Sequence, residues 1–320
     1  MKLFKNIQRT RLVLGVAALF ALAPLAHAES DLGSPAETAQ IVSEDYKGLV
    51  ERAFPRFDGD VLGRRIATIR RAYPEGYDTV TVRKIGDLES LLGLPHSALT
   101  GGDFVATTEG TYGISATSGR IHFARNVDEL PPMAFDDAQR AQREIEARHA
   151  GLLAKVGIDA KQVLFANTGI LSLRSQERGA PEESAKLQAD AVFTYALREI
   201  DGLQVEGSEA KLASRSDGEL VNLSLRWPAM RVHPELTDFS LKSTDELKRE
   251  VLAHVETSAN RSPVSVRMAV VLRPVKARTG QVFVPSLKVG VMPKEEAGEV
   301  FYIDLPRQQL AYDEGEVTDK

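Results

Sequence analysis

The stretch FTYALREIDGLQVEGSEAKLASRSDGELVNLSLRW, Phe193 to Trp227, decides the fold class, because it alternates extended segments with short turns. DGLQVEG and SDG place glycines where a tight hairpin needs a positive φ. The last segment alternates two sets of side chains, apolar Val221, Leu223, Leu225 and Trp227 and mostly polar Leu220, Asn222, Ser224 and Arg226. The stretch therefore predicts a three-stranded antiparallel meander with one apolar and one solvated face.

Residues 1 to 28 have the three parts of a secretory signal peptide. Basic residues precede an apolar run from Leu12 to Leu25, and Ala26-His27-Ala28 supplies the small-x-small cleavage pattern. The run is shorter than the roughly 20 residues that a membrane-spanning helix needs. We therefore expect cleavage after Ala28, no transmembrane segment in the mature chain, and a bacterial protein that is periplasmic or secreted.

The mature chain is acidic and contains no cysteine. Cleavage removes four basic residues, so the formal net charge falls from -5 to -9, which disfavours nucleic acid as a partner. The absence of cysteine excludes disulfides, thiolate metal sites, a cysteine nucleophile and a lipid-bearing cysteine. An exported chain without disulfides draws its stability from a buried core.

A helix followed by extended segments appears three times along the chain. Helical spacing of apolar residues predicts helices at 42–53, 62–73, 138–156 and 244–255, the last behind a capping box of Ser243 and Glu246. Besides the meander, extended segments are predicted at 79–85, 112–125, 162–174, 264–272, 282–289 and 300–305. We expect an α+β fold of two or three modules, each a helix packed on an antiparallel sheet. The expected modules are 29–130, 131–235 and 236–308, followed by an acidic tail at 309–320.

The meander resembles a known family. Gly202, Val205, Gly207, Asp217 and Gly218 fall at the positions of the two turns of the thermolysin and fungalysin propeptide (FTP) family. Residues 243–305 are similar to a PepSY module, including VFVPSLKVGV at 282–291. The resemblance spans residues 160–305 and implies PepSY/cystatin-like modules that chaperone or inhibit a peptidase. Since no peptidase domain follows the module in this sequence, the resemblance implies action in trans.

Signals of catalytic chemistry are weak. His96, His122, His149, His233 and His254 are isolated, and no His-Glu-x-x-His pattern occurs. His149 lies on the apolar stripe of the predicted helix 138–156 and is interpreted as a hydrogen-bonded core residue. The string from Ser208 to Lys211 matches Ser-x-x-Lys but lacks its companion motifs. We therefore predict a non-enzymatic protein with no catalytic residue, cofactor or metal.

The expected function is binding of a protein or peptide through exposed strands. The predicted partner is an extended segment of a secreted metallopeptidase, which the protein would inhibit, chaperone or regulate. The predicted contact residues all lie on the meander: Tyr195, Arg198, Asp201 and Arg226. Two alternatives stay open: an envelope scaffold or assembly factor, and a hydrolase whose site requires carboxylates, or His122 and His233, to converge.

Overall fold

A computed structural model describes residues 46–55, 58–72, 80–95, 104–115, 118–126, 131–175, 185–257, 263–277, 280–293 and 298–310. The predicted signal peptide and nearly all of the predicted acidic tail lie outside the described residues. The helices are α2 (Tyr46–Ala53), α3 (Gly59–Ala72), α4 (Ile85–Leu92), α5 (Phe135–Lys155) and α6 (Thr244–Thr257), with a 3-10 turn, η3 (Ala160–Gln162). The strands are β1 (Phe104–Ala106), β2 (Gly110–Ser115), β3 (Arg120–Arg125), β4 (Met133–Ala134), β5 (Val163–Ser175), β6 (Lys186–Ile200), β7 (Leu203–Ser214), β8 (Leu220–Arg226), β9 (Pro263–Ala277), β10 (Gly280–Pro293) and β11 (Glu299–Asp304).

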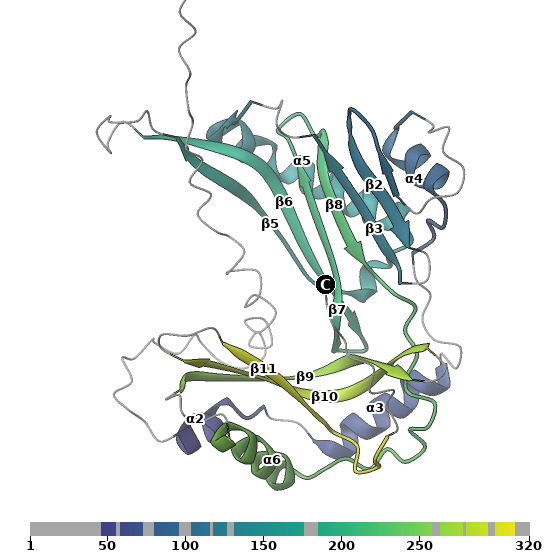
Figure 1. Ribbon diagram of the computed structural model, residues 1–320, viewed down its shortest axis with the longest axis vertical. Helices are drawn as coiled ribbons and strands as arrows, with labels where there is room; N and C mark the ends of the chain where they lie inside the picture. The colour runs from purple at the N-terminus through teal and green to yellow at the C-terminus, as the bar shows by residue number, and fades with distance from the viewer. Residues whose placement is uncertain are drawn as a thin grey trace, which may run out of the picture. The chain divides into compact units, whose positions relative to one another are not determined.

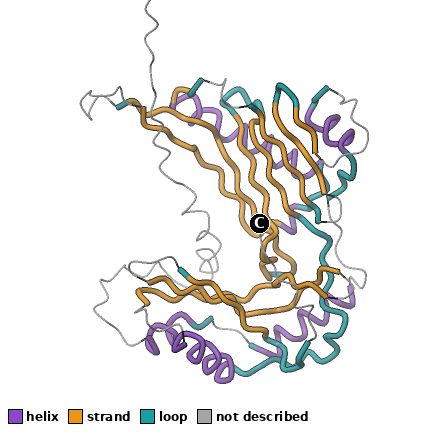
Figure 2. Tube along the Cα trace, in the orientation of Figure 1, coloured by secondary structure: helices purple, strands orange, loops and turns teal. Residues whose placement is uncertain are grey.

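The strands of the described residues join one hydrogen-bonded mixed sheet. Figure 2 shows these strands along the Cα trace in orange and the helices in purple. Its path runs β1-β2-β3-β8-β7-β9-β10-β11, with β6 attached to β7, and with β4 and β5 attached to β6. Strands β7 and β9 pair in parallel, at Gln204 with Val271 and Val205 with Leu272. The prediction of two or three separate PepSY/cystatin-like modules, each a helix on an antiparallel sheet, is therefore wrong.

The long β6–β7 hairpin is the reason for this difference. Its strands have 15 and 12 residues, more than the sheet of a small module requires, and the start of β7 pairs with β9. Alternation of apolar and polar residues reveals which face of a strand is buried, but not which distant strand lies beside it. The parallel pairing of β7 with β9 could therefore not be predicted from the sequence pattern.

The described residues cluster into two compact units. The first comprises residues 80–196 and 209–227, and the second comprises 46–72, 197–208 and 228–310. Each unit collects segments that are distant in the sequence, so neither coincides with one of the three expected modules. Strands β6 and β7 contribute residues to both units.

In the first unit, α5 covers one face of the sheet and lies behind strands β5 to β8 in Figure 1. The core between them contains inward side chains of three strands and of the end of α5: Ile121, Phe123, Leu212, Leu223, Leu225, Leu153 and Val156. The predicted apolar side of β8 is confirmed, because Val221, Leu223, Leu225 and Trp227 are all buried. The polar side of β8 therefore faces away from the helix.

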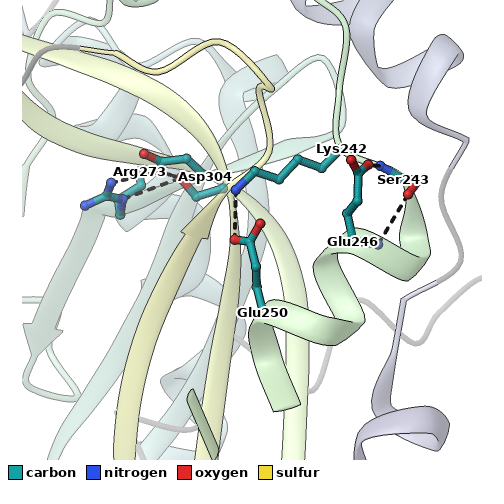
Figure 3. A network of polar contacts seen from close by, with 7 residues as sticks. Lys242, Ser243, Glu246, Glu250, Arg273 and Asp304 are labelled. Atoms are coloured by element: carbon teal, nitrogen blue, oxygen red, sulfur yellow. Dashed lines mark hydrogen bonds and ion pairs between the residues drawn. The ribbon is translucent and has the colours of Figure 1, made fainter. Parts of the chain in front are cut away.

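In the second unit, helices α2, α3 and α6 cover one face of strands β9 to β11 (Figure 1). Their core includes Val50, Ile66, Leu247, Val251, Leu272, Phe283 and Leu287. Helix α6 begins with the predicted capping box, in which the Glu246 N–H donates to Ser243 Oγ and the Ser243 N–H donates to the Glu246 carboxylate (Figure 3). The capping box thus fixes where this helix begins.

The turns of the meander have the backbone that their glycines predict. Gly202 has φ 76° in the β6–β7 turn, and Gly218 has φ 87° in the β7–β8 turn. Asp201, beside Gly202, also has a positive φ of 50°. Glycine adopts this left-handed backbone without the steric cost that a Cβ imposes.

One predicted segment differs in kind from the structure. Residues 80–84 of the predicted strand 79–85 form no strand, and helix α4 begins at Ile85. Leu88 of α4 is fully buried, and Leu91 and Leu92 pack against the same core. Separately, among the helices of the described ranges we find none whose length and apolar character would allow it to cross a membrane.

Candidate functional site

Strand β5 forms an edge of the sheet. Among the described residues, β6 is its one strand neighbour. Residues 163–173, VLFANTGILSL, contain no charged side chain and no proline. Natural edge strands are commonly short, or carry lysine or proline that prevents another strand from adding to them. An edge strand of 13 residues without these features offers its backbone N–H and C=O groups to another chain.

Side chains from β6 and α5 hold the middle of β5. A Cβ on Gly169 would lie 2.8 Å from Phe193 Cε1, so the phenylalanine ring of β6 packs directly on this glycine. Thr168 Oγ1 lies 3.0 Å from Thr194 Oγ1 of β6, and Gln142 Nε2 of α5 donates to the Thr168 carbonyl at 2.7 Å. Contacts with β6 and with α5 therefore hold β5 in an extended conformation. A further strand could pair with a backbone in this conformation.

In the first unit, the sheet face opposite α5 carries polar side chains on the neighbouring strands β3, β8 and β7. We call its five residues the basic face: Arg120, His122, Lys211, Ser224 and Arg226. Strand register aligns them in two rows, one formed by Arg120 and Arg226 and the other by His122, Ser224 and Lys211. All five are exposed or half-buried.

Only one carboxylate, that of Glu209, continues the first row, directly across from Arg226. Glu209 Oε1 accepts from Lys211 Nζ at 2.7 Å, and Glu209 Oε2 accepts from the Tyr195 hydroxyl at 2.9 Å. The Lys211 ammonium also lies 5.6 Å from the centre of the Tyr195 ring. Glu209 is thus engaged by Lys211 and Tyr195, whereas within the described residues no hydrogen bond or ion pair is formed by the side chains of Arg120 and Arg226.

The structure separates the four predicted contact residues. Tyr195 and Arg226 belong to the first unit, where Tyr195 is buried with its hydroxyl donating to Glu209 and Arg226 is partly exposed beside the same glutamate. Arg198 is completely buried in the second unit, where its guanidinium donates to the Pro228 carbonyl. Asp201 lies in the β6–β7 turn of the second unit, half-exposed, with Arg65 Nε at 3.6 Å. The burial of Arg198 gives it a structural role that its sequence position did not indicate.

The second unit carries a polar network that the sequence analysis missed. Arg273 Nη2 and Ser286 Oγ both donate to Asp304 Oδ1 at 2.8 Å (Figure 3). Lys288 Nζ donates to Glu206 Oε1 at 2.7 Å. Strand register places Ser286 directly across from Asp304 and Lys288 across from Tyr302. The alternation of Ser286 and Lys288 with apolar residues of β10 was the available signal, and this pattern alone identifies a polar face without naming its partners.

Tyr302 belongs to the same network. Burial raises the pKa of its phenol, the negative charge and hydrogen bond of Glu206 raise it further, and Arg273 acts in the opposite direction. The Arg273 guanidinium lies 5.5 Å from the centre of the Tyr302 ring. The phenol keeps its proton at neutral pH. The network thus pairs two cations, Arg273 and Lys288, with two carboxylates, Asp304 and Glu206, across strands β7, β9, β10 and β11.

His149 is a buried structural histidine, as predicted. Its Nδ1 lies 2.7 Å from Thr194 Oγ1 and its Nε2 lies 2.8 Å from Ser214 Oγ. Burial lowers the pKa of the imidazole to about 4, which keeps the ring neutral. Both ring nitrogens therefore serve the core of the first unit.

The two histidines of the hydrolase alternative belong to different units. His122 belongs to the basic face of the first unit, whereas His233 is buried in the second unit, where its Nδ1 accepts from the Glu235 N–H. Across the described ranges, no group of three or more histidines and carboxylates has the arrangement of a metal site.

No family model matches the chain, and no curated protein matches it.

Proposed function

We propose that this is an exported binding protein that holds an extended segment of a partner protein, such as a peptidase, by strand addition along β5. The observation that carries the proposal is the edge of β5, 13 residues long and without charge or proline from 163 to 173. Addition of a strand there would satisfy backbone groups that water otherwise solvates.

The side chains that flank this edge favour a polypeptide over a small ligand. Leu164 is exposed, and Ile170, Leu171 and Leu173 are partly buried. Alternate side chains of an added strand would lie beside apolar residues on both faces of the sheet, which gives specificity to a contact whose affinity comes from the backbone. A binding role in trans would follow from this contact without any catalytic group.

Site-specific crosslinking in the natural host tests the proposal. A photoreactive amino acid replaces Ser172, an exposed residue of β5, in the full chain, and Ala150, exposed on α5, serves as the matched control position. We expect a discrete protein adduct from position 172 and none from 150, and mass spectrometry of the adduct identifies the partner. Adducts of equal yield from both positions would contradict binding at the edge.

Hydrogen exchange with the identified partner then distinguishes strand addition from other contacts. Backbone amides of β5 that face the free edge should become protected at alternate residues when the partner binds. Ser172→Lys, which adds a charge to the edge, should abolish this protection, and Ala150→Lys should not. An adduct that consists of two copies of this chain would assign the edge to a homodimer and refute the partner proposal.

A further inference from the structure

We infer that the basic face is a second binding site, which accepts carboxylates at alternate positions of an extended acidic polypeptide segment. The contacts proposed within the basic face are Arg120 and Arg226 in one row and His122 and Ser224 in the next, where Lys211 is already paired with Glu209. It does not depend on strand addition at β5.

The pairing of Arg120 with Arg226 is the first observation. These arginines occupy directly opposite positions of β3 and β8, and like charges at such positions destabilise a sheet. Glu209, the carboxylate aligned with Arg226, is bound by Lys211 and Tyr195 instead. Two arginines at paired positions, neither of which forms an ion pair within the described residues, suit a carboxylate, which accepts bidentate hydrogen bonds from arginine.

The spacing of the two rows is the second observation. Arg120 and His122 are two residues apart on β3, as are Ser224 and Arg226 on β8. Residues two apart on a strand lie about 6.6 Å from one another on the same face. A polypeptide segment that lies extended over the strands repeats its side chains at the same interval, so its alternate carboxylates would reach both rows.

The charge balance is the third observation. The sequence as a whole has a formal net charge of -5, yet this face presents three cationic side chains and one carboxylate. The local positive potential of this face attracts an acidic segment, although the net charge of the protein is negative. Complementary charge therefore selects the occupant of this otherwise polar face.

Peptide binding to purified full-length protein tests the site. The probe is a fluorescent dodecapeptide of alternating glutamate and serine, and fluorescence anisotropy is measured at low and at physiological salt. The Arg120→Gln, Arg226→Gln double variant should bind about tenfold more weakly, since exposed charge pairs contribute up to about 1 kcal/mol each and 1.4 kcal/mol is tenfold. The matched control, Arg140→Gln with Arg143→Gln on α5, removes the same charge and should change affinity less than about twofold.

Each of three other results would overturn the inference. Equal weakening by the control variant would show attraction by net charge alone. Equal binding of an alternating glutamine and serine peptide would exclude carboxylate recognition. Competition by dextran sulfate at the same concentration of anionic groups would assign the face to polysaccharide.

Two further measurements make the test decisive. Thermal unfolding of both double variants verifies that each is folded before binding is compared. Ser172→Lys should leave peptide binding unchanged. A failure of the β5 proposal can therefore be distinguished from a failure of this inference.

Discussion

The buried His149 makes the stability of the first unit depend on pH. The pKa of the imidazole is about 6.5 in an unfolded chain and about 4 in the fold, because burial disfavours the cation. Neither contact partner, Thr194 or Ser214, supplies a negative charge. Between these two pKa values the unfolded chain binds a proton that the folded chain does not, so stability is complete above pH 6.5 and falls as the pH drops towards 4.

The magnitude follows from the shift. One pKa unit corresponds to 1.36 kcal/mol, so lowering the pH from 7.5 to 4.5 should cost about 2.5 kcal/mol through this histidine alone. Urea unfolding at a series of pH values measures the effect through the fluorescence of Trp227, the one tryptophan of the chain, which is buried in the same unit.

His149→Gln supplies the comparison, because glutamine retains hydrogen-bonding groups and does not titrate. Acid destabilisation from carboxylates elsewhere is common to both proteins and cancels in the difference. The wild type should therefore lose about 2.5 kcal/mol more than the variant over this pH range. Parallel pH profiles for the two proteins would refute the assignment of His149 as a buried neutral residue.

Other substitutions test particular contacts of the fold. Arg120→Gln removes a like-charge neighbour of Arg226 and should stabilise the first unit by about 0.5 kcal/mol in urea unfolding, whereas a loss would show that Arg120 has a favourable partner. Gly157→Ala should destabilise the same unit by at least about 1 kcal/mol, because Gly157 has φ 91° and an added Cβ would lie 2.6 Å from Thr81 Cγ2; unchanged stability would contradict this backbone. Ser243→Ala should cost about 1 kcal/mol and accelerate hydrogen exchange at the start of α6, and unaltered exchange there would contradict the capping box.

The features that the sequence predicted well are local. The apolar side of β8, the glycine turns of the meander, the capping box of α6 and the burial of His149 each depend on residues within a few positions of one another. Residues 80–84 were mistaken for a strand in part because they include β-branched side chains, whereas the structure forms no strand there and helix α4 begins at Ile85.

The candidate sites were predictable only in part. Tyr195 and Arg226 were predicted as contact residues because they lie on the meander; Arg226 is partly exposed, whereas Tyr195 is buried. Arg198 has the same kind of sequence environment, yet the fold buries it against Pro228. The edge position of β5 and the alignment of Arg120 with Arg226 depend on strand order, which no local pattern records.

The meander, the positions of most helices and strands, and the apolar face of β8 could be predicted from the sequence, because side-chain periodicity and turn chemistry act over a few residues. Three features emerge only from the folded chain: the strands form one mixed sheet, β5 lies at its edge, and two arginines from distant segments occupy opposite positions. These features arise from backbone pairing, and backbone hydrogen bonds are chemically alike in every strand, so the choice of neighbour is made by the packing of the whole chain.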